Sequence, residues 1–184
     1  MDLNEKNRAD ARAIYKKGHE FGNHMPEDKA YDDLDELEFS SQLEETERCL
    51  QTLMQELKVE EEEKERGNFQ EEDFRPAAVQ VASTKWFRPP LAKISSSMLS
   101  VLQRGGYKVA LADVFANDVL FQDCEYLCHV VRKHVKAGSI LCLHMPDEGF
   151  REKNVEETRL VLQVLKEKGL KATTLTELYN KSSA

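Results

Sequence analysis

Two stretches near the N-terminus show the spacing of apolar and polar residues that amphipathic helices require. Residues 5–17 lack glycine and proline, carry Ile14 as their main apolar anchor, and precede Gly18, which stands where a helix-terminating glycine belongs. The second stretch has apolar residues at positions 43, 50, 53, 54 and 57, and Ser41 and Glu44 form a capping-box pair before them. These patterns predict helices over residues 5–17 and 41–57.

Residues 58–76 are rich in Asp and Glu and contain few large apolar side chains. Such a composition cannot bury enough surface to fold alone. Two interpretations fit: an exposed or mobile acidic insertion, or a solvated acidic extension of the preceding helix.

After this segment, short apolar runs alternate with amphipathic stretches. The runs predict strands at 78–83, 107–112, 139–144 and 170–174. The stretches between them predict helices at 95–104, 123–137 and 154–168, which are followed by Gly105, Gly138 and Gly169. Asn154 with Glu157, and Thr176 before Glu177, are predicted N-terminal caps. The alternation predicts an α/β fold with mostly parallel strands, whose chemistry gathers at the carboxyl ends of the strands.

Composition narrows the possible classes. The chain has 184 residues, 40% hydrophobic and 33% charged, which suits one soluble domain. A net charge of −8 removes the electrostatic driving force for nonspecific nucleic-acid binding. No apolar run approaches the roughly 18 residues of a membrane span, and the first residues lack the pattern of a signal peptide, so the chain as written is expected to be cytoplasmic.

Four cysteines are too few for a disulfide framework, and we expect them to be reduced and mostly buried. Cys124 and Cys128 share one face of a predicted helix, whereas His129 points about 100° away from it. This arrangement favours core packing over a zinc site.

Three groups of polar residues carry candidate chemistry. His24 and Asp28 place an imidazole and a carboxylate four residues apart, where one turn of chain can direct both at a divalent ion; a surface loop is the alternative. In residues 86–90, Arg88 can orient a carboxylate and the flanking aromatic rings can stack on a sugar; a rigid turn over a core Trp is the alternative. Asp118 and His144 stand at the ends of successive predicted strands, so His144 is placed where a general acid would lie; a satisfied structural histidine is the alternative.

Taken in order, these segments resemble the polysaccharide deacetylases of carbohydrate esterase family 4, which include chitin and peptidoglycan deacetylases and share the NodB homology domain. Residues 18–24, Gly-His-Glu-Phe-Gly-Asn-His, resemble the second motif of the family. Residues 87–90, Phe-Arg-Pro-Pro, resemble the third motif, and residues 138–144, Gly-Ser-Ile-Leu-Cys-Leu-His, the fifth. The stretch 157–178 resembles the end of the family domain.

The resemblance implies an incomplete, distorted (β/α) barrel with mostly parallel strands over residues 18–184, with a helix at 1–17 before it and the acidic insertion at 58–76 within it. It implies metal-dependent hydrolysis of N-acetyl groups on an amino-sugar polysaccharide or oligosaccharide. The implied cofactor is a divalent metal, usually zinc, which activates water and polarises the carbonyl.

The resemblance also implies roles for individual residues. His24 stands for the first histidine ligand of the metal, and Asp28 stands where the second is expected. Arg88 would orient the catalytic base, Asp118 would pair with the acid histidine, and His144 would protonate the leaving amine. The implied substrate contacts are Trp86, Phe87, Pro90 and Leu91.

The sequence departs from the family pattern in several places. The first motif, a strand ending in two aspartates that supply the base and a metal ligand, should precede Gly18 by several tens of residues, and only 17 residues stand there. Asp32 and Asp33 are adjacent but follow the histidine motif. The remaining departures are Asp28 for histidine, Leu91 for an aromatic residue, Val119 for tryptophan and Cys142 for leucine.

Three hypotheses follow from these departures. The chain is a metal-dependent deacetylase, a noncatalytic pseudoenzyme or carbohydrate-binding remnant, or the truncated product of a longer gene. Loss of the general base would remove about 10² to 10⁴-fold of the rate. Absence of the first strand would also leave an open sheet edge, which favours self-association.

Overall fold

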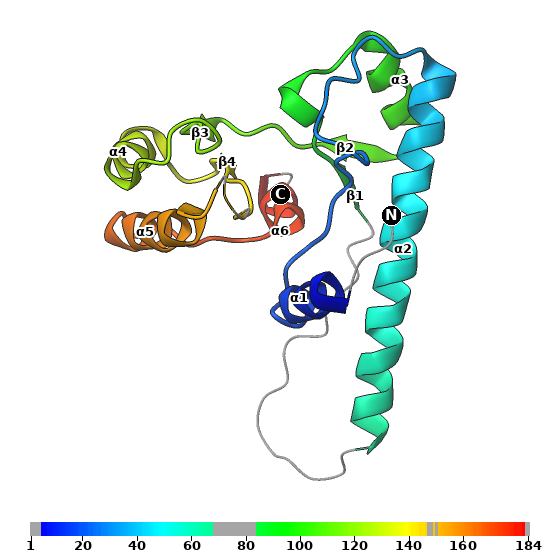
Figure 1. Ribbon diagram of the computed structural model, residues 1–184, viewed down its shortest axis with the longest axis horizontal. Helices are drawn as coiled ribbons and strands as arrows, with labels where there is room; N and C mark the ends of the chain where they lie inside the picture. The colour runs from blue at the N-terminus through cyan, green and yellow to red at the C-terminus, as the bar shows by residue number, and fades with distance from the viewer. Residues whose placement is uncertain (1–4, 68–83, 147–148, 150, 183–184) are drawn as a thin grey trace. The chain divides into compact units, whose positions relative to one another are not determined.

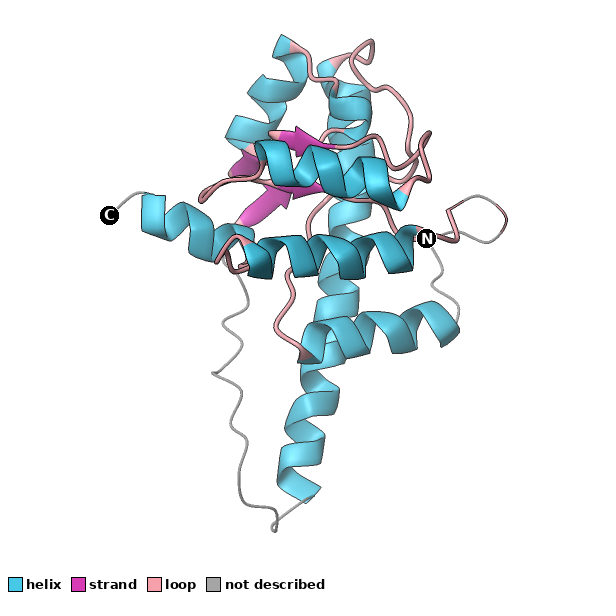
Figure 2. Ribbon diagram, turned by 90° about the vertical axis from the view of Figure 1, so that its left-hand side faces the viewer, coloured by secondary structure: helices cyan, strands magenta, loops and turns pink. Residues whose placement is uncertain are grey.

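The computed structural model describes residues 5–67, 84–146, 149 and 151–182. Contacts divide the chain into two units, Met1–Ala110 and Leu111–Ala184 (Figure 1). Both combine helices with short parallel strands, and helix predominates (Figure 2). Among the described residues, none of the helices combines the length and the apolar character of a membrane span.

The first unit begins with the two predicted helices, α1 (Glu5–Lys16) and α2 (Glu36–Gly67). Gly18 follows α1 with a φ of 79°, in the left-handed region that favours glycine. The predicted capping box is wrong, because α2 begins before Ser41 and Asp35 Oδ1 accepts hydrogen bonds from the N–H groups of Leu37 and Glu38.

The acidic segment is helical where the structure describes it. Residues 58–67 continue α2, which agrees with the interpretation as a helical extension. Residues 68–76 of that segment and the strand predicted at 78–83 lie outside the described residues.

A small parallel sheet completes the first unit. Strand β1 (Lys85–Phe87) pairs with β2 (Tyr107–Val109), and the connection between them contains the 3₁₀ turn η1 (Pro90–Ala92) and helix α3 (Ser96–Arg104). Phe87 lies at the centre of the core and makes an edge-to-face contact with Phe39 of α2. The other fully or nearly buried residues of this core are Met25, Tyr31, Leu43, Met98, Val101 and Leu102.

The second unit contains another parallel pair, β3 (Val114–Phe115) and β4 (Leu141–Cys142), and helices α4 (Cys124–His134), α5 (Asn154–Glu167) and α6 (Leu175–Ser182). Its core joins β3, α4 and α5, and Cys128 is buried in it. The other three cysteines are only partly buried, so the prediction that most of them are buried is wrong.

Three predictions for the second unit need correction. Strand β3 was not predicted, and residues 170–174 are not a strand. Thr174, not Thr176, caps α6 by accepting a hydrogen bond from the Glu177 N–H. Asn154 lies inside α5 and its side chain bonds elsewhere, so it is not the predicted cap.

Candidate functional site

Asp118 and His144 meet at the carboxyl ends of β3 and β4. The two strands are parallel, with Val114 opposite Leu141 and Phe115 opposite Cys142. Asp118 and His144 follow shortly after these strands, so both leave the sheet at the same edge. Nδ1 of His144 lies 3.0 Å from Oδ1 of Asp118. The contact between these two side chains is therefore confirmed, while their catalytic roles stay predictions.

Hydrogen bonds hold the Asp118 carboxylate in one orientation. Its Oδ2 accepts from the His144 backbone N–H at 2.7 Å and from Asn154 Nδ2 at 3.0 Å. Its Oδ1 faces His144 Nδ1, and because an ionised carboxylate only accepts, Nδ1 must carry a proton. Asp118 is fully buried, whereas the His144 side chain keeps 14% of its surface exposed.

Asn154 ties the pair to helix α5. Its Nδ2 donates both to Asp118 Oδ2 and, at 2.9 Å, to the backbone carbonyl of His144. Sequence reasoning missed this role, because an asparagine ahead of an apolar run also has the pattern of a helix cap. No spacing signal could have found it, since Asp118 lies 36 residues earlier in the chain.

The second predicted group lies in the first unit, around His24. A bridge pairs Asn23 with Phe87, and backbone hydrogen bonds join Asn23 to Trp86 and Arg88 at 2.8 and 3.0 Å. Gly22 comes so close to Trp86 that an added Cβ would lie 3.3 Å from its backbone oxygen and its Cβ. The glycine in this motif therefore allows the loop to lie against the end of β1.

His24 and Asp28 have the positions of two possible metal ligands. His24 Nδ1 lies 2.6 Å from the carbonyl oxygen of Arg88 and donates to it, which directs Nε2 away from the strand. Nε2 lies 3.6 Å from Asp28 Oδ1, a separation that a cation bonded to both atoms at about 2.1 Å would span.

The donor set is small. Within residues 5–67, 84–146, 149 and 151–182, no three or more His, Cys, Asp or Glu side chains are placed to hold one metal ion. An imidazole and a carboxylate fit a divalent cation in type and geometry, but two protein ligands are one fewer than a catalytic zinc site usually has.

Asn23 is a further residue to which sequence reasoning gave no role. It is buried, its Oδ1 accepts from the Met25 N–H, and its Nδ2 donates to the carbonyl of Leu43 on α2. These bonds anchor the His24 loop to α2. Met25, within this loop, has a φ of 62°. Only its place in the motif could have indicated this function.

The four predicted substrate contacts differ in exposure. Trp86 and Pro90 are buried, and Phe87 is fully buried, so its ring packs in the core and cannot stack on a sugar in this conformation. Leu91 is 57% exposed and has a φ of 53°. The buried positions agree with the alternative of a rigid turn, and a substrate contact at this turn stays a prediction.

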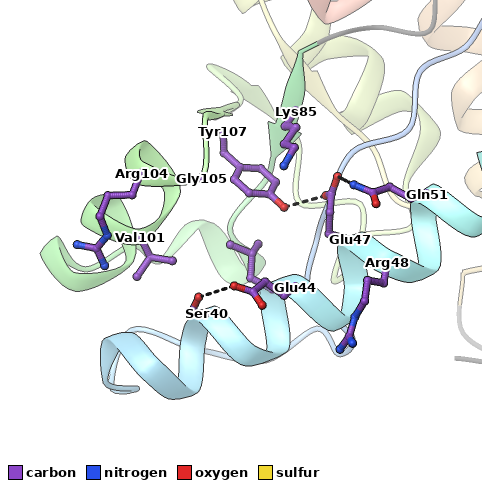
Figure 3. A pocket seen from close by; sticks show the side chains of 11 residues that line it. Ser40, Glu44, Glu47, Arg48, Gln51, Lys85, Val101, Arg104, Gly105 and Tyr107 are labelled. Atoms are coloured by element: carbon purple, nitrogen blue, oxygen red, sulfur yellow. Dashed lines mark hydrogen bonds between the residues drawn. The ribbon is translucent and has the colours of Figure 1, made fainter.

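A pocket of about 490 Å³ lies between α2, α3 and the sheet of the first unit (Figure 3). Within it, the Tyr107 hydroxyl donates to Glu47 Oε2 at 2.9 Å, and Lys85 lies over the Tyr107 ring. Burial, followed by the bond to Glu47, raises the pKa of Tyr107. Lys85 and Tyr107 begin β1 and β2, so this pocket lies at the opposite strand ends from Arg88.

Comparison with known proteins identifies the fold. No protein-family model matches the chain, and no curated protein matches it significantly. Among solved structures, it resembles a family 4 acetyl xylan esterase from Clostridium thermocellum in complex with a cobalt ion, with a TM-score of 0.69 and 20% identity over 99% of this chain and 74% of the esterase.

Other solved structures match as well, among them a peptidoglycan deacetylase and a pseudoenzyme. The peptidoglycan deacetylase PdaC of Bacillus subtilis has a TM-score of 0.64 and 18% identity, over 97% of this chain and 70% of that one. A carbohydrate esterase family 4 pseudoenzyme of Bacillus anthracis has a TM-score of 0.68 and 20% identity, over 95% of this chain and 51% of that one. At these identities the likeness is one of fold.

Proposed function

Because the chain has the polysaccharide deacetylase-like fold of carbohydrate esterase family 4, we propose that it acts on N-acetyl groups of an amino-sugar polymer, with His144 as the general acid. The hydrogen bond between His144 and buried Asp118 is the observation that supports this proposal. It supplies an oriented imidazole at the carboxyl end of a strand, where this fold class holds its chemistry.

The roles of the pair follow from its hydrogen bonds. Asp118 accepts from Nδ1, so Nε2 is the atom that would carry a proton toward substrate. As the C–N bond of the acetamide breaks, the leaving nitrogen takes this proton, and the Asp118 carboxylate stabilises the imidazolium before transfer. Acid catalysis of this kind accelerates a reaction by about 10² to 10⁴-fold.

In this proposal, His24 and Asp28 would hold a divalent cation, with zinc as the expected metal. When bound, the cation would polarise the acetyl carbonyl and activate water. Arg88 would orient a carboxylate that acts as the general base. In the family this base comes from the first motif, and the sequence contains no match to that motif. Trp86 and Leu91 would contact the sugar.

A noncatalytic function is the second candidate. The small donor set at His24 and Asp28 favours it, because a third protein ligand is not among the described residues. The fold similarity to a pseudoenzyme also supports it. Such a protein would bind amino-sugar oligosaccharides without cleaving them.

The test combines metal analysis of the purified chain with acetate release from acetylated chitooligosaccharides, with and without added zinc. We expect slow, metal-dependent release that falls to background in His144→Gln but not in His134→Gln, an exposed histidine at the end of α4. Calorimetric binding without acetate release would favour the noncatalytic candidate. If the protein neither binds the oligosaccharides nor releases acetate from them, both candidate functions are contradicted.

A further inference from the structure

Helix α5 carries two buried polar groups that have no partner among the described residues. They are Oδ1 of Asn154 and both carboxyl oxygens of Glu157. The residues are 2% and 1% exposed, and Glu157 is the largest buried acid of this core. Unpaired buried groups of this kind are rare in native proteins, so these need a physical explanation.

Asn154 and Glu157 are three residues apart in α5, a spacing at which one side chain can reach the other. Residues three apart in a helix share a face, with Cβ atoms about 5–6 Å apart. The amide oxygen of Asn154 is an acceptor, and so is an ionised carboxylate. The pair is satisfied only when the Glu157 carboxyl carries a proton and donates it.

The surroundings of Glu157 favour the protonated form. Burial raises the pKa of this carboxyl, and the negative charge of Asp118 raises it further. The ionisable groups that face it from the β3–α4 loop, α4 and α5 are Asp118, Asp123, Cys124, Cys128, Lys153 and Glu156. Of these, Lys153 is the one that lowers the pKa of Glu157.

We propose that Glu157 is a positioning residue that stays protonated in the folded protein and donates a hydrogen bond to Asn154 Oδ1. This bond fixes which end of the Asn154 amide faces each neighbour. Nδ2 is then directed at Asp118 Oδ2 and the His144 carbonyl, where it is observed. The role of this bond in orienting a catalytic histidine rests on the proposed function. The protonation of Glu157 does not.

Infrared spectroscopy of the folded protein with ¹³C-carboxyl-labelled glutamate tests the proton directly. At pH 7 we expect a protonated-carboxyl band in the wild type that is absent from Glu157→Gln and present in Glu156→Gln. Glu156 is the exposed neighbour on the same helix and serves as the matched control. A wild-type spectrum without this band overturns the proposal.

Stability measurements give an independent test. A carboxyl with a raised folded pKa stabilises the fold below its unfolded value of about 4.3, and this contribution is lost as pH rises. Glu157→Gln keeps a donor and cannot ionise, so its stability relative to the wild type should increase from pH 5 to pH 8. A pH-independent difference contradicts the proposal.

A third readout isolates positioning from packing. Glu157→Met has a similar volume but no donor, so we expect it to shift the Asn154 side-chain amide signals and the ¹⁵N signals of His144, whereas Glu157→Gln leaves them near their wild-type positions. Unchanged signals in Glu157→Met would refute the positioning role. None of these readouts depends on turnover, so absent deacetylase activity would count against the proposed function alone.

Discussion

At the scale of single residues, Asp118 organises more of the site than any other side chain described. Its two oxygens accept three hydrogen bonds, from the His144 ring, the His144 backbone and Asn154. Because the carboxylate is fully buried, these bonds replace the water it would otherwise bind. The tautomer of His144 is therefore set by a residue 26 positions earlier.

We predict that Asp118→Asn reverses this tautomer. The asparagine places its oxygen where two donors converge, so its amide group faces His144 Nδ1, which must then accept and leave the proton on Nε2. ¹⁵N spectroscopy of the neutral ring should show this change. The variant should also lose about 1–3 kcal/mol of unfolding free energy. An Nδ1–H tautomer in the variant would contradict the observed pairing.

At the scale of elements, side chains outside the regular structure decide where helices and strands begin. Asp35 caps α2 through two backbone N–H groups, although Ser41 with Glu44 matches the capping-box pattern. Asp113 plays a comparable part for β4, since its carboxylate accepts from the Ile140 N–H at 2.6 Å and the Ser139 hydroxyl at 3.0 Å.

The position of the α2 cap is testable by a pair of alanine substitutions. Asp35→Ala should lower the unfolding free energy by about 1 kcal/mol, because two N–H groups lose their acceptor. Ser41→Ala, at an exposed position inside the helix, should change it by less than about 0.5 kcal/mol. Urea unfolding compares the two, and a larger effect at Ser41 would restore the capping box.

The hydrogen bonds of Asp113 predict that its contribution to the stability of the fold depends on pH. Partial desolvation of its carboxyl raises the pKa of Asp113, but the hydrogen bonds from Ile140 and Ser139 outweigh this effect, so the net pKa is lowered. Its contribution is therefore present above the unfolded value of about 3.9 and is lost as pH falls through the folded value.

Asp113→Asn should accordingly cost about 0.5–1 kcal/mol at pH 7, a modest figure because the side chain is exposed. The cost should shrink at pH 3. Urea unfolding at both values measures it, with Asp10→Asn, an exposed acid on α1, as the control. An equal cost at both pH values would show that the carboxylate charge is irrelevant.

At the scale of the whole molecule, exposed apolar side chains predict self-association. Leu120 and Phe121 are 71% and 53% exposed, and the Phe121 ring contacts that of Tyr126. We expect oligomers at micromolar concentration and at least about tenfold weaker association in Leu120→Lys, because burying one leucine contributes about 1.5–3 kcal/mol.

Sedimentation over a range of concentrations measures this association. Leu37→Lys is the matched control. Leu37 is more exposed than Leu120 but lies on α2, far in sequence from Leu120, Phe121 and Tyr126. A monomeric wild type would contradict the prediction. If Leu120→Lys and Leu37→Lys weaken self-association equally, the contact between copies does not lie at Leu120.

Local patterns in the sequence correctly predicted the helices with strong apolar periodicity and the alternation of strands and helices. They could do so because periodicity is local. The contact of Asp118 with His144 was predicted from a strand at 107–112, but β2 pairs with β1, and it is the unpredicted strand β3 that lies beside β4 and precedes Asp118. The segment resembling the second motif predicted that His24 and Asp28 lie together, as the structure shows.

The remaining features depend on contacts between distant parts of the chain. Strand β3 has two residues and exists through its hydrogen bonds to residues 140–142, which no local propensity encodes. Asn154 has the pattern of a cap, yet its amide bonds to Asp118 and the His144 carbonyl. Glu157 has the pattern of a surface acid and is buried beside them. Such roles depend on long-range packing, because a polar side chain bonds to whichever groups the folded chain brings within reach.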